Sequence, residues 1–215
     1  MFMLAMKILG LMILAGAVGY LLGSFPTAYV LVRWKTSKDI RSEGSGNVGT
    51  LNSYVVTKSK LLGATVLIID FLKGAAAVAV VGLFVDGFIY LAAAGVGAVL
   101  GHTFPVWLGF KGGRGLATSA GVMVSLGWIV VVVWAVLWVL GFLITRNVNV
   151  GNAIASVISL VLILAAPASV LMFAKPNDAS IAHFKYFVVL LFGVVIIKHI
   201  EPVTKYVAEK TRRQA

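Results

Sequence analysis

The sequence predicts an all-α, polytopic membrane protein with about seven transmembrane helices. Of its 215 residues, 60% are hydrophobic and only 12% are charged, and the mean hydropathy is +1.03. A soluble chain averages about a quarter charged residues, so this chain has too little polar surface to cover a globule and must turn apolar side chains toward lipid. These observations exclude intrinsic disorder and a water-soluble enzyme.

The first expected span is the uncharged run at residues 8–32, which follows Lys7. It is longer than the roughly 7–15 apolar residues of a signal peptide, so we expect a span that is retained. Gly19 and Gly23 within it form a GxxxG pair, which predicts close packing against another helix.

The later spans follow from gaps between charged residues. The stretch 116–145 could be one tilted helix or two short ones broken near Ser125 and Gly127. Two helices would put the basic segment 111–114 on the same side as Arg146, as the positive-inside rule favours. The expected spans are 8–32, 61–85, 87–110, two within 116–145, 150–174, and 186–199, with Lys175, Asp178 and Lys185 in the last turn.

The distribution of basic residues predicts the orientation. Lys and Arg number 18 against 7 Asp and Glu, a net charge of +11, and most of them fall in loops on one side. The positive-inside rule then places the N-terminus outside and the C-terminus in the cytoplasm, so the charge reports topology and no nucleic acid is expected as a partner. We expect one integral-membrane domain at 1–204 and a basic cytoplasmic tail at 205–215, attracted to anionic lipid.

The first basic loop contains Gly44-Ser-Gly-Asn-Val-Gly49, which matches the GxGxxG pattern but follows no strand. Its glycines permit positive φ, so that consecutive N–H groups can converge on an anion. Ser45, Gly46, Asn47 and Asn52 are the candidate substrate contacts here. The alternative is an ordinary tight turn after a helix.

The second loop, Lys111-Gly-Gly-Arg-Gly115, directly precedes a long apolar stretch. A helix N-terminus offers free N–H groups and a partial positive charge, so this is a candidate phosphate site. Lys111 is the proposed catalytic cation, with Gly112, Gly113, Arg114, Gly115 and Thr118 as substrate contacts. The alternative is a basic loop that only sets topology, but such a loop has no need of three glycines.

Four ionisable residues stand inside or near the ends of the spans. Asp70 and Lys73 are three residues apart and therefore share a helical face; they either serve the function or hold helices together. His102 and His199 lie near inner ends of spans, and each could be a base, a phosphate donor or a packing residue.

Two anion loops at one face of an apolar bundle imply phosphorylated ligands that meet a membrane. The chain has no cysteine, and no paired carboxylates, metal cluster or Ser/His/Asp set is evident. The substrate would therefore have to arrive activated, as an acyl phosphate does.

The residues resemble the family of acyl-phosphate-dependent glycerol-3-phosphate acyltransferases (PlsY) over most of the chain. The resemblance is carried by Leu21-Leu-Gly-Ser-Phe-Pro26, the 44–49 loop, Asp70-Phe-Leu-Lys-Gly74 and, above all, the run from His102 to Thr118. It implies a seven-span enzyme of the bacterial inner membrane whose active site faces the cytoplasm. The enzyme would transfer an acyl group from acyl phosphate to the 1-hydroxyl of glycerol 3-phosphate, giving lysophosphatidic acid and phosphate, the first step of phospholipid synthesis.

By the same resemblance, Ser45, Gly46 and Asn47 belong to a substrate loop, residues 111–115 to a phosphate-binding loop, and His199 to the substrate site. Arg146 is a further expected substrate contact. No metal or cofactor is implied, and a soluble enzyme that makes acyl phosphate is a possible partner besides membrane lipid.

Several positions depart from the family pattern. Thr50-Leu51-Asn52 stands where the family reads Ala-Thr-Asn, and a following arginine has no match except Lys58 or Lys60. Asn149 and Asn152 replace two serines, and Pro202 replaces an asparagine. These changes fall in segments that we expect to bind the acyl acceptor, glycerol 3-phosphate. The 111–115 loop, which we expect to bind the acyl donor, matches the family pattern.

Three other functions were weighed. Acyltransferases that use His-x4-Asp are excluded because Trp107 lies five positions after His102. A transporter of phosphate or organic anions would need charges along a path through the spans. A divergent paralogue with a changed acceptor or no activity remains an alternative.

Overall fold

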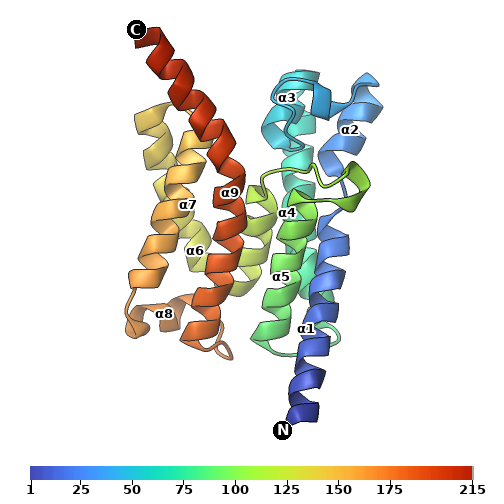
Figure 1. The fold of residues 1–215 in the computed structure, drawn as a ribbon, viewed down its shortest axis with the longest axis vertical. Helices are drawn as coiled ribbons and strands as arrows, with labels where there is room; N and C mark the ends of the chain where they lie inside the picture. The colour runs from blue at the N-terminus through green and yellow to red at the C-terminus, as the bar shows by residue number, and fades with distance from the viewer. Residues whose placement is uncertain (215) are drawn as a thin grey trace. The chain divides into compact units, whose positions relative to one another are not determined.

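The computed structural model describes residues 1–214, and this part of the chain is helical with no strand. Six segments within it are long and apolar enough to cross a membrane. The predicted all-α membrane fold is confirmed. The count of six takes residues 116–145 as one segment, so the seven-span topology and the orientation of the termini stay predictions. The chain forms two compact units, Met1–Leu126 and Gly127–Ala215, each of which is described by itself (Figure 1).

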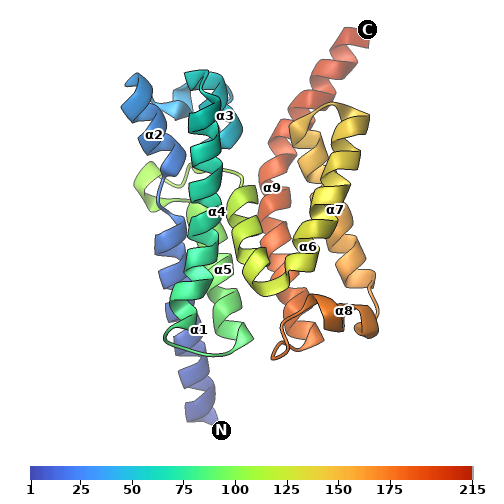
Figure 2. The ribbon, with the colours of Figure 1, turned by 180° about the vertical axis from the view of Figure 1, so that it is seen from behind.

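The first unit is built around three long helices, with shorter ones at the end away from the N-terminus (Figure 2). Its elements are α1 (Phe2–Gly23), α2 (Thr27–Thr36), the short 3-10 turn η1 (Ile40–Ser42), α3 (Thr50–Thr57), α4 (Lys60–Gly82), α5 (Phe88–Thr103), the 3-10 turn η2 (Val106–Leu108) and the start of α6 (Leu116–Thr145). The α2, α3 and η2 segments surround the end of α4 and α5 where both glycine-rich loops lie.

Helices α1 and α5 pack through small residues, as the GxxxG pair predicts. A Cβ atom added to Gly19 or Gly23 would collide with the backbone of Ala94 or Ala98 on α5. The contact is reciprocal, because a Cβ on Gly97 would collide with the backbone of α1. Close approach of two backbones in this way is the usual basis of helix association in lipid.

The expected span at 8–32 lies within one apolar segment, Phe2–Thr36, that is long enough to cross a membrane. Its helix, however, breaks between α1 and α2 at residues 24–26. Pro26 has no N–H to continue the helix, and it disfavours helical geometry at Phe25. At the break the carbonyl of Phe25 accepts from the N–H of Thr27 at 3.0 Å and from the ammonium of Lys73 on α4 at 3.0 Å.

The second unit contains the rest of α6, α7 (Val148–Ala165), α8 (Ala168–Ala174) and α9 (Ile181–Gln214). Gly127, at its start, has non-helical φ and ψ of 175° and 59° inside α6. This confirms a break near Ser125 and Gly127. The side chain of Trp134 on α6 donates to Ser156 on α7 at 3.0 Å, and α7 runs along α9.

Two expected boundaries in this unit are wrong. The predicted span at 150–174 ends at Ala165, since Pro167 interrupts it before α8. Lys185 lies on α9 and not in the turn, and its ammonium donates to the carbonyl of Leu164 at 2.7 Å, at the end of α7. Residues 205–214 of the expected tail continue α9, and Ala215 lies outside the described residues.

Candidate active site

The first glycine-rich loop is held by a local ion pair and two left-handed glycines. Asp39 accepts from the backbone N–H of Arg41 at 2.9 Å, and its carboxylate contacts the guanidinium at 2.6 Å. The hydrogen bonds from Arg41 lower the pKa of Asp39 from 3.8 to about 2. Gly44 and Gly46 have φ of 56° and 72°, so the expected positive-φ geometry is present.

The tip of this loop carries its accessible polar groups. Ser45 is exposed, and its hydroxyl accepts from the N–H of Asn47 at 3.4 Å. Asn47 is half-buried beside Gly46. The tip is therefore the part of the loop that a ligand can reach.

Asn52 has a different place from the one expected of a substrate contact. It is 2% exposed, and its Nδ2 donates to the carbonyls of Ile40 at 3.2 Å and Glu43 at 3.0 Å. Its Oδ1 accepts from the N–H of Ser45 at 3.0 Å. Because three of its hydrogen bonds go to the loop backbone, Asn52 fixes the loop's conformation.

The second glycine-rich loop leaves the end of α5 and folds back onto it. The N–H of Gly112 donates to the carbonyl of Thr103 at 3.2 Å, and that of Gly113 donates to the carbonyl of His102 at 3.1 Å. A Cβ on Gly113 would collide with Nε2 of His102 and the carbonyl oxygen of Val48. These two glycines thus serve close packing, and their N–H groups already have acceptors within the protein.

The accessible part of this loop lies around its two cations. Lys111 is exposed and Arg114 is half-buried, while Gly115 takes a φ of 84° just before α6 begins at Leu116. The first N–H groups of a helix have no acceptor within that helix. Thr118, expected to bind substrate, is fully buried in the first turn of α6, with its carbonyl against Gly74.

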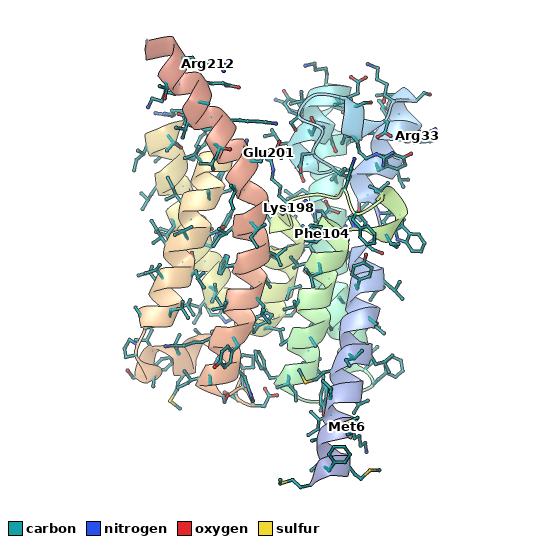
Figure 3. The ribbon with its side chains drawn as sticks, viewed as in Figure 1. Met6, Arg33, Phe104, Lys198, Glu201 and Arg212 are labelled. Atoms are coloured by element: carbon teal, nitrogen blue, oxygen red, sulfur yellow. The ribbon has the colours of Figure 1, made fainter. Side chains whose placement is uncertain are left out.

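The structure brings the two loops together. Nη1 of Arg41 donates to the carbonyl of Leu108 at 3.4 Å. Val48 of the first loop and Ile40 of η1, just before it, share an apolar cluster with Leu108 of η2, just before the second loop. Arg33 lies toward this end of the unit, opposite Met6, and Phe104 lies between the two (Figure 3). Both loops therefore present their polar groups in one region.

A buried ionic cluster lies beneath them. Nζ of Lys73 is 2.8 Å from Oδ1 of Asp70, and Nδ1 of His102 is 3.6 Å from the same oxygen. The side chains are 8%, 3% and 7% exposed, respectively. The residues contributed by α4 share one face, as their spacing predicts.

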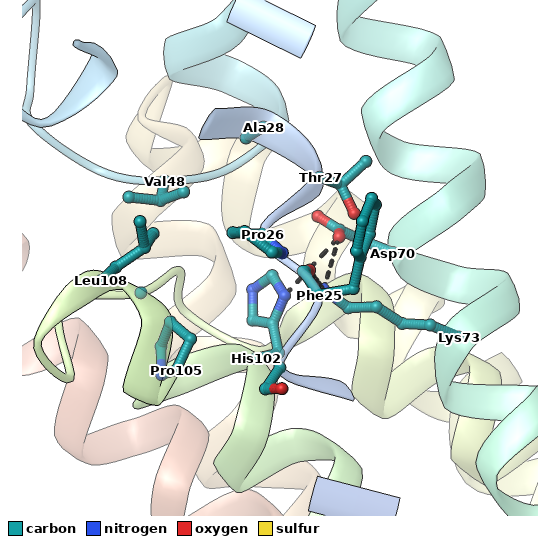
Figure 4. Close-up of a pocket in the computed structure, with 12 residues that line it drawn as sticks. Phe25, Pro26, Thr27, Ala28, Val48, Asp70, Lys73, His102, Pro105 and Leu108 are labelled. Carbon is teal, nitrogen blue, oxygen red and sulfur yellow. Dashed lines mark hydrogen bonds and ion pairs between the residues drawn. The ribbon is translucent and has the colours of Figure 1, made fainter. Parts of the chain in front are cut away.

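A small pocket opens above the cluster, with room for about one water molecule (Figure 4). It lies between the α1–α2 break and the second loop, and its polar lining includes Asp70, Lys73 and His102. Gly112 lies at its edge on the loop side.

Sequence reasoning missed the side chains that anchor the second loop to α1. Nε1 of Trp107 donates to the hydroxyl of Ser24 at 2.8 Å, and the hydroxyl of Tyr20 donates to the carbonyl of Phe104 at 2.7 Å. Ser24 and Tyr20 both lie in the expected first span, and no local pattern indicates such distant partners.

The second unit holds His199 in a buried hydrogen-bonded position. The imidazole is 1% exposed; Nδ1 lies 2.7 Å from the carbonyl of Val195, and Nε2 lies 3.4 Å from Nδ2 of Asn152. Asn152 is thus the partner of the histidine that the resemblance places in the substrate site.

The remaining expected site residue, Arg146, is exposed between α6 and α7 with a φ of 53°, and its N–H donates to Phe142 at 2.7 Å. Asn149 lies in the first turn of α7, where its N–H donates to the side chain of Asn147 at 2.9 Å. Pro202 lies inside α9.

Residues 13–209 match the family model described as glycerol-3-phosphate acyltransferase. Curated glycerol-3-phosphate acyltransferases are similar in sequence. The one from Brucella ovis is 40% identical over 181 residues, which cover 84% of this chain and 82% of that protein. The one from Mesorhizobium japonicum is 39% identical over 197 residues, which cover 92% and 93%.

Solved structures agree. The crystal structure of PlsY (YgiH), an integral membrane glycerol 3-phosphate acyltransferase, in its glycerol 3-phosphate form matches with a TM-score of 0.75 and 28% identity, covering 94% of this chain and 93% of that one. Its lysophosphatidic acid form matches with a TM-score of 0.74 and 26% identity, covering 92% of each. The chain belongs to the PlsY family of integral membrane glycerol-3-phosphate acyltransferases.

Proposed function

We propose that this protein transfers an acyl group from acyl phosphate to the 1-hydroxyl of glycerol 3-phosphate, giving lysophosphatidic acid and inorganic phosphate. The observation that carries the proposal is the second loop, where Lys111 and Arg114 stand accessible beside the start of α6. Two cations and a helix N-terminus suit a phosphate group. The solved PlsY structures in glycerol 3-phosphate and lysophosphatidic acid forms support the acceptor and the product.

In this proposal Lys111, Arg114 and the first N–H groups of α6 bind the phosphate of the donor and stabilise its negative charge as it leaves. The acceptor hydroxyl attacks the acyl carbon, a new ester bond forms, and the bond from that carbon to the phosphate oxygen breaks. Catalysis is then positioning and electrostatic stabilisation, without a covalent enzyme intermediate. The hydroxyl proton passes to His102, His199 or a phosphate oxygen of a substrate.

The same proposal places the site at the cytoplasmic face of a bacterial inner membrane. Glycerol 3-phosphate and phosphate are water-soluble, whereas the acyl chain belongs in lipid, so the reaction suits loops at the end of a helix bundle. A soluble enzyme that makes acyl phosphate would supply the donor. The gathering of both loops at one end of the first unit favours chemistry at an interface over transport.

The experiment is phosphate release by the purified protein in lipid with palmitoyl phosphate, with and without glycerol 3-phosphate, while mass spectrometry follows the lipid product. Release that depends on glycerol 3-phosphate and yields lysophosphatidic acid supports the proposal. If phosphate is released only with another acceptor, the protein uses that acceptor in place of glycerol 3-phosphate. The substitutions at Asn149, Asn152 and Pro202 would then account for the change of acceptor. Donor binding without turnover for any acceptor would refute the enzymatic proposal in favour of an inactive paralogue.

A further inference from the structure

The turn of α4 at residues 70–74 supports both ends of the second glycine-rich loop. Before the loop, His102 of α5 contacts Asp70; after it, the carbonyl of Thr118 on α6 lies against Gly74, where a Cβ would collide with it. A single turn of helix therefore touches the residues that flank the loop on either side.

We propose that Asp70 and Lys73 are positioning residues that set the place of the 111–115 loop through His102. This inference rests on the proposed function insofar as it takes the loop to be the phosphate site. In this proposal the two residues act through His102 and not on the reacting atoms, so they are positioning residues and not catalytic residues.

The first step links the loop to His102. The N–H of Gly113 donates to the histidine's carbonyl at 3.1 Å, and the histidine ring fills the space where a Cβ of residue 113 would lie. Any shift of the imidazole would therefore displace the loop or open a gap beneath it.

The second step links His102 to the rest of the unit. Oδ1 of Asp70 faces both Nδ1 of His102 at 3.6 Å and Nζ of Lys73 at 2.8 Å. Lys73 also donates to the carbonyl of Phe25 at 3.0 Å. The Asp70 carboxylate is thereby held between α5 and the α1–α2 break, and it lies beside the histidine ring (Figure 4).

Helix packing alone gives a weaker account of this pair. Two buried charges lose their hydration, and apolar residues of similar volume commonly hold helices as well or better. What an apolar pair cannot supply is a carboxylate beside the imidazole and a second donor, besides the N–H of Thr27, for the carbonyl of Phe25 at the helix break. In this structure the carboxylate of Asp70 lies beside the imidazole, and the ammonium of Lys73 donates to the carbonyl of Phe25.

The test compares wild type with the double variant Asp70→Leu/Lys73→Met in lipid. Removing both charges together avoids the unpaired buried charge that either apolar single substitution would leave. Hydrogen–deuterium exchange of the peptide that contains Gly112 and Gly113 reports on the loop. The KM for palmitoyl phosphate and kcat report on donor binding and turnover, and the thermal midpoint reports on folding.

We expect the double variant to fold and to exchange faster at residues 112–115. Its KM for palmitoyl phosphate should rise by about 10- to 100-fold, because a small misplacement of a binding group can have effects of this order. Its kcat should change less. Lys185→Met is the matched control. It removes another lysine that donates to a helix-end carbonyl, that of Leu164, and should leave exchange at 112–115 unchanged.

Unchanged exchange and KM in the folded double variant would overturn the proposal and leave the pair only a packing role. A loss of kcat with unchanged exchange and KM would also overturn it. If the double variant does not fold, Asp70→Asn replaces it: faster exchange at 112–115 in that folded variant supports the proposal, and wild-type exchange contradicts it. Exchange does not depend on turnover, so its result stands even if no acyl transfer is found.

Discussion

Nδ2 of Asn152 lies 3.4 Å from Nε2 of His199, while Nδ1 of the same ring lies 2.7 Å from the carbonyl oxygen of Val195. A carbonyl oxygen only accepts hydrogen bonds, so we assign the ring proton to Nδ1, and Nε2 then accepts from the Asn152 amide. Asn152, which stands where the resemblance to the family implies a serine, thus occupies the lone pair that a general base would use.

Replacing Asn152 with alanine should lower the free energy of unfolding by about 1–3 kcal/mol, because it leaves a buried ring nitrogen without its donor. Asn152→Ser, which restores the family residue, keeps a hydroxyl and should fall between alanine and wild type. Denaturant unfolding in detergent measures both. The control is Asn177→Ala, in the exposed turn before α9, which should change the free energy of unfolding by less than about 0.5 kcal/mol. An Asn152→Ala variant as stable as wild type would contradict the hydrogen bond from Asn152 to Nε2 of His199.

Lys111→Met should abolish phosphate release from palmitoyl phosphate without unfolding the protein. Lys111 is exposed, so its loss removes a cation from the donor site and little packing. Phosphate release and the thermal midpoint, measured on the same preparation, separate the two effects. Lys35→Met removes another exposed positive charge, from α2, and should keep wild-type activity. Wild-type rates in a folded Lys111→Met protein would remove Lys111 from the mechanism.

Gly113→Ala should lower kcat/KM for acyl phosphate by about 100-fold, since the added methyl group would collide with His102 and Val48 and displace the loop. Steady-state kinetics with a varied donor concentration check this. Gly10→Ala is the control: nothing lies within 4 Å of its added Cβ, and alanine in a helix interior is favoured by about 1 kcal/mol. Equal kcat/KM values in the two variants would show that the position of the loop does not depend on the absence of a Cβ beside His102.

The sequence predicts local features of this site well and its long-range contacts poorly. Helical spacing correctly placed Asp70 and Lys73 on one face, and the glycine pattern correctly indicated positive φ at Gly44 and Gly46. The Lys73–Phe25 contact could not be predicted, because it depends on a helix break inside an uncharged run.

The dependence on long-range contacts also explains why the roles of Gly112, Gly113 and Asn52 differ from those that the sequence predicts. Residue type suggested that Gly112 and Gly113 would offer N–H groups to phosphate, yet the end of α5 folds near enough to accept them. Asn52 has the chemistry of a ligand contact, but the loop wraps around it and uses its amide internally. Such roles depend on how the chain folds back, which local sequence patterns do not encode.

The Asp39–Arg41 pair predicts a pH dependence of stability in acid. Hydrogen bonds from Arg41 hold the folded-state pKa of Asp39 at about 2, below the ordinary value of 3.8, so below about pH 4 the unfolded chain binds a proton that the folded chain does not. The stabilisation is therefore complete above about pH 4 and is lost as the pH falls toward about 2. Thermal midpoints should show wild type more stable than Asp39→Asn at neutral pH, with the gap narrowing in acid. Asp86→Asn, in the turn before α5, should keep the wild-type profile, and a constant gap between wild type and Asp39→Asn across this window would contradict the pairing.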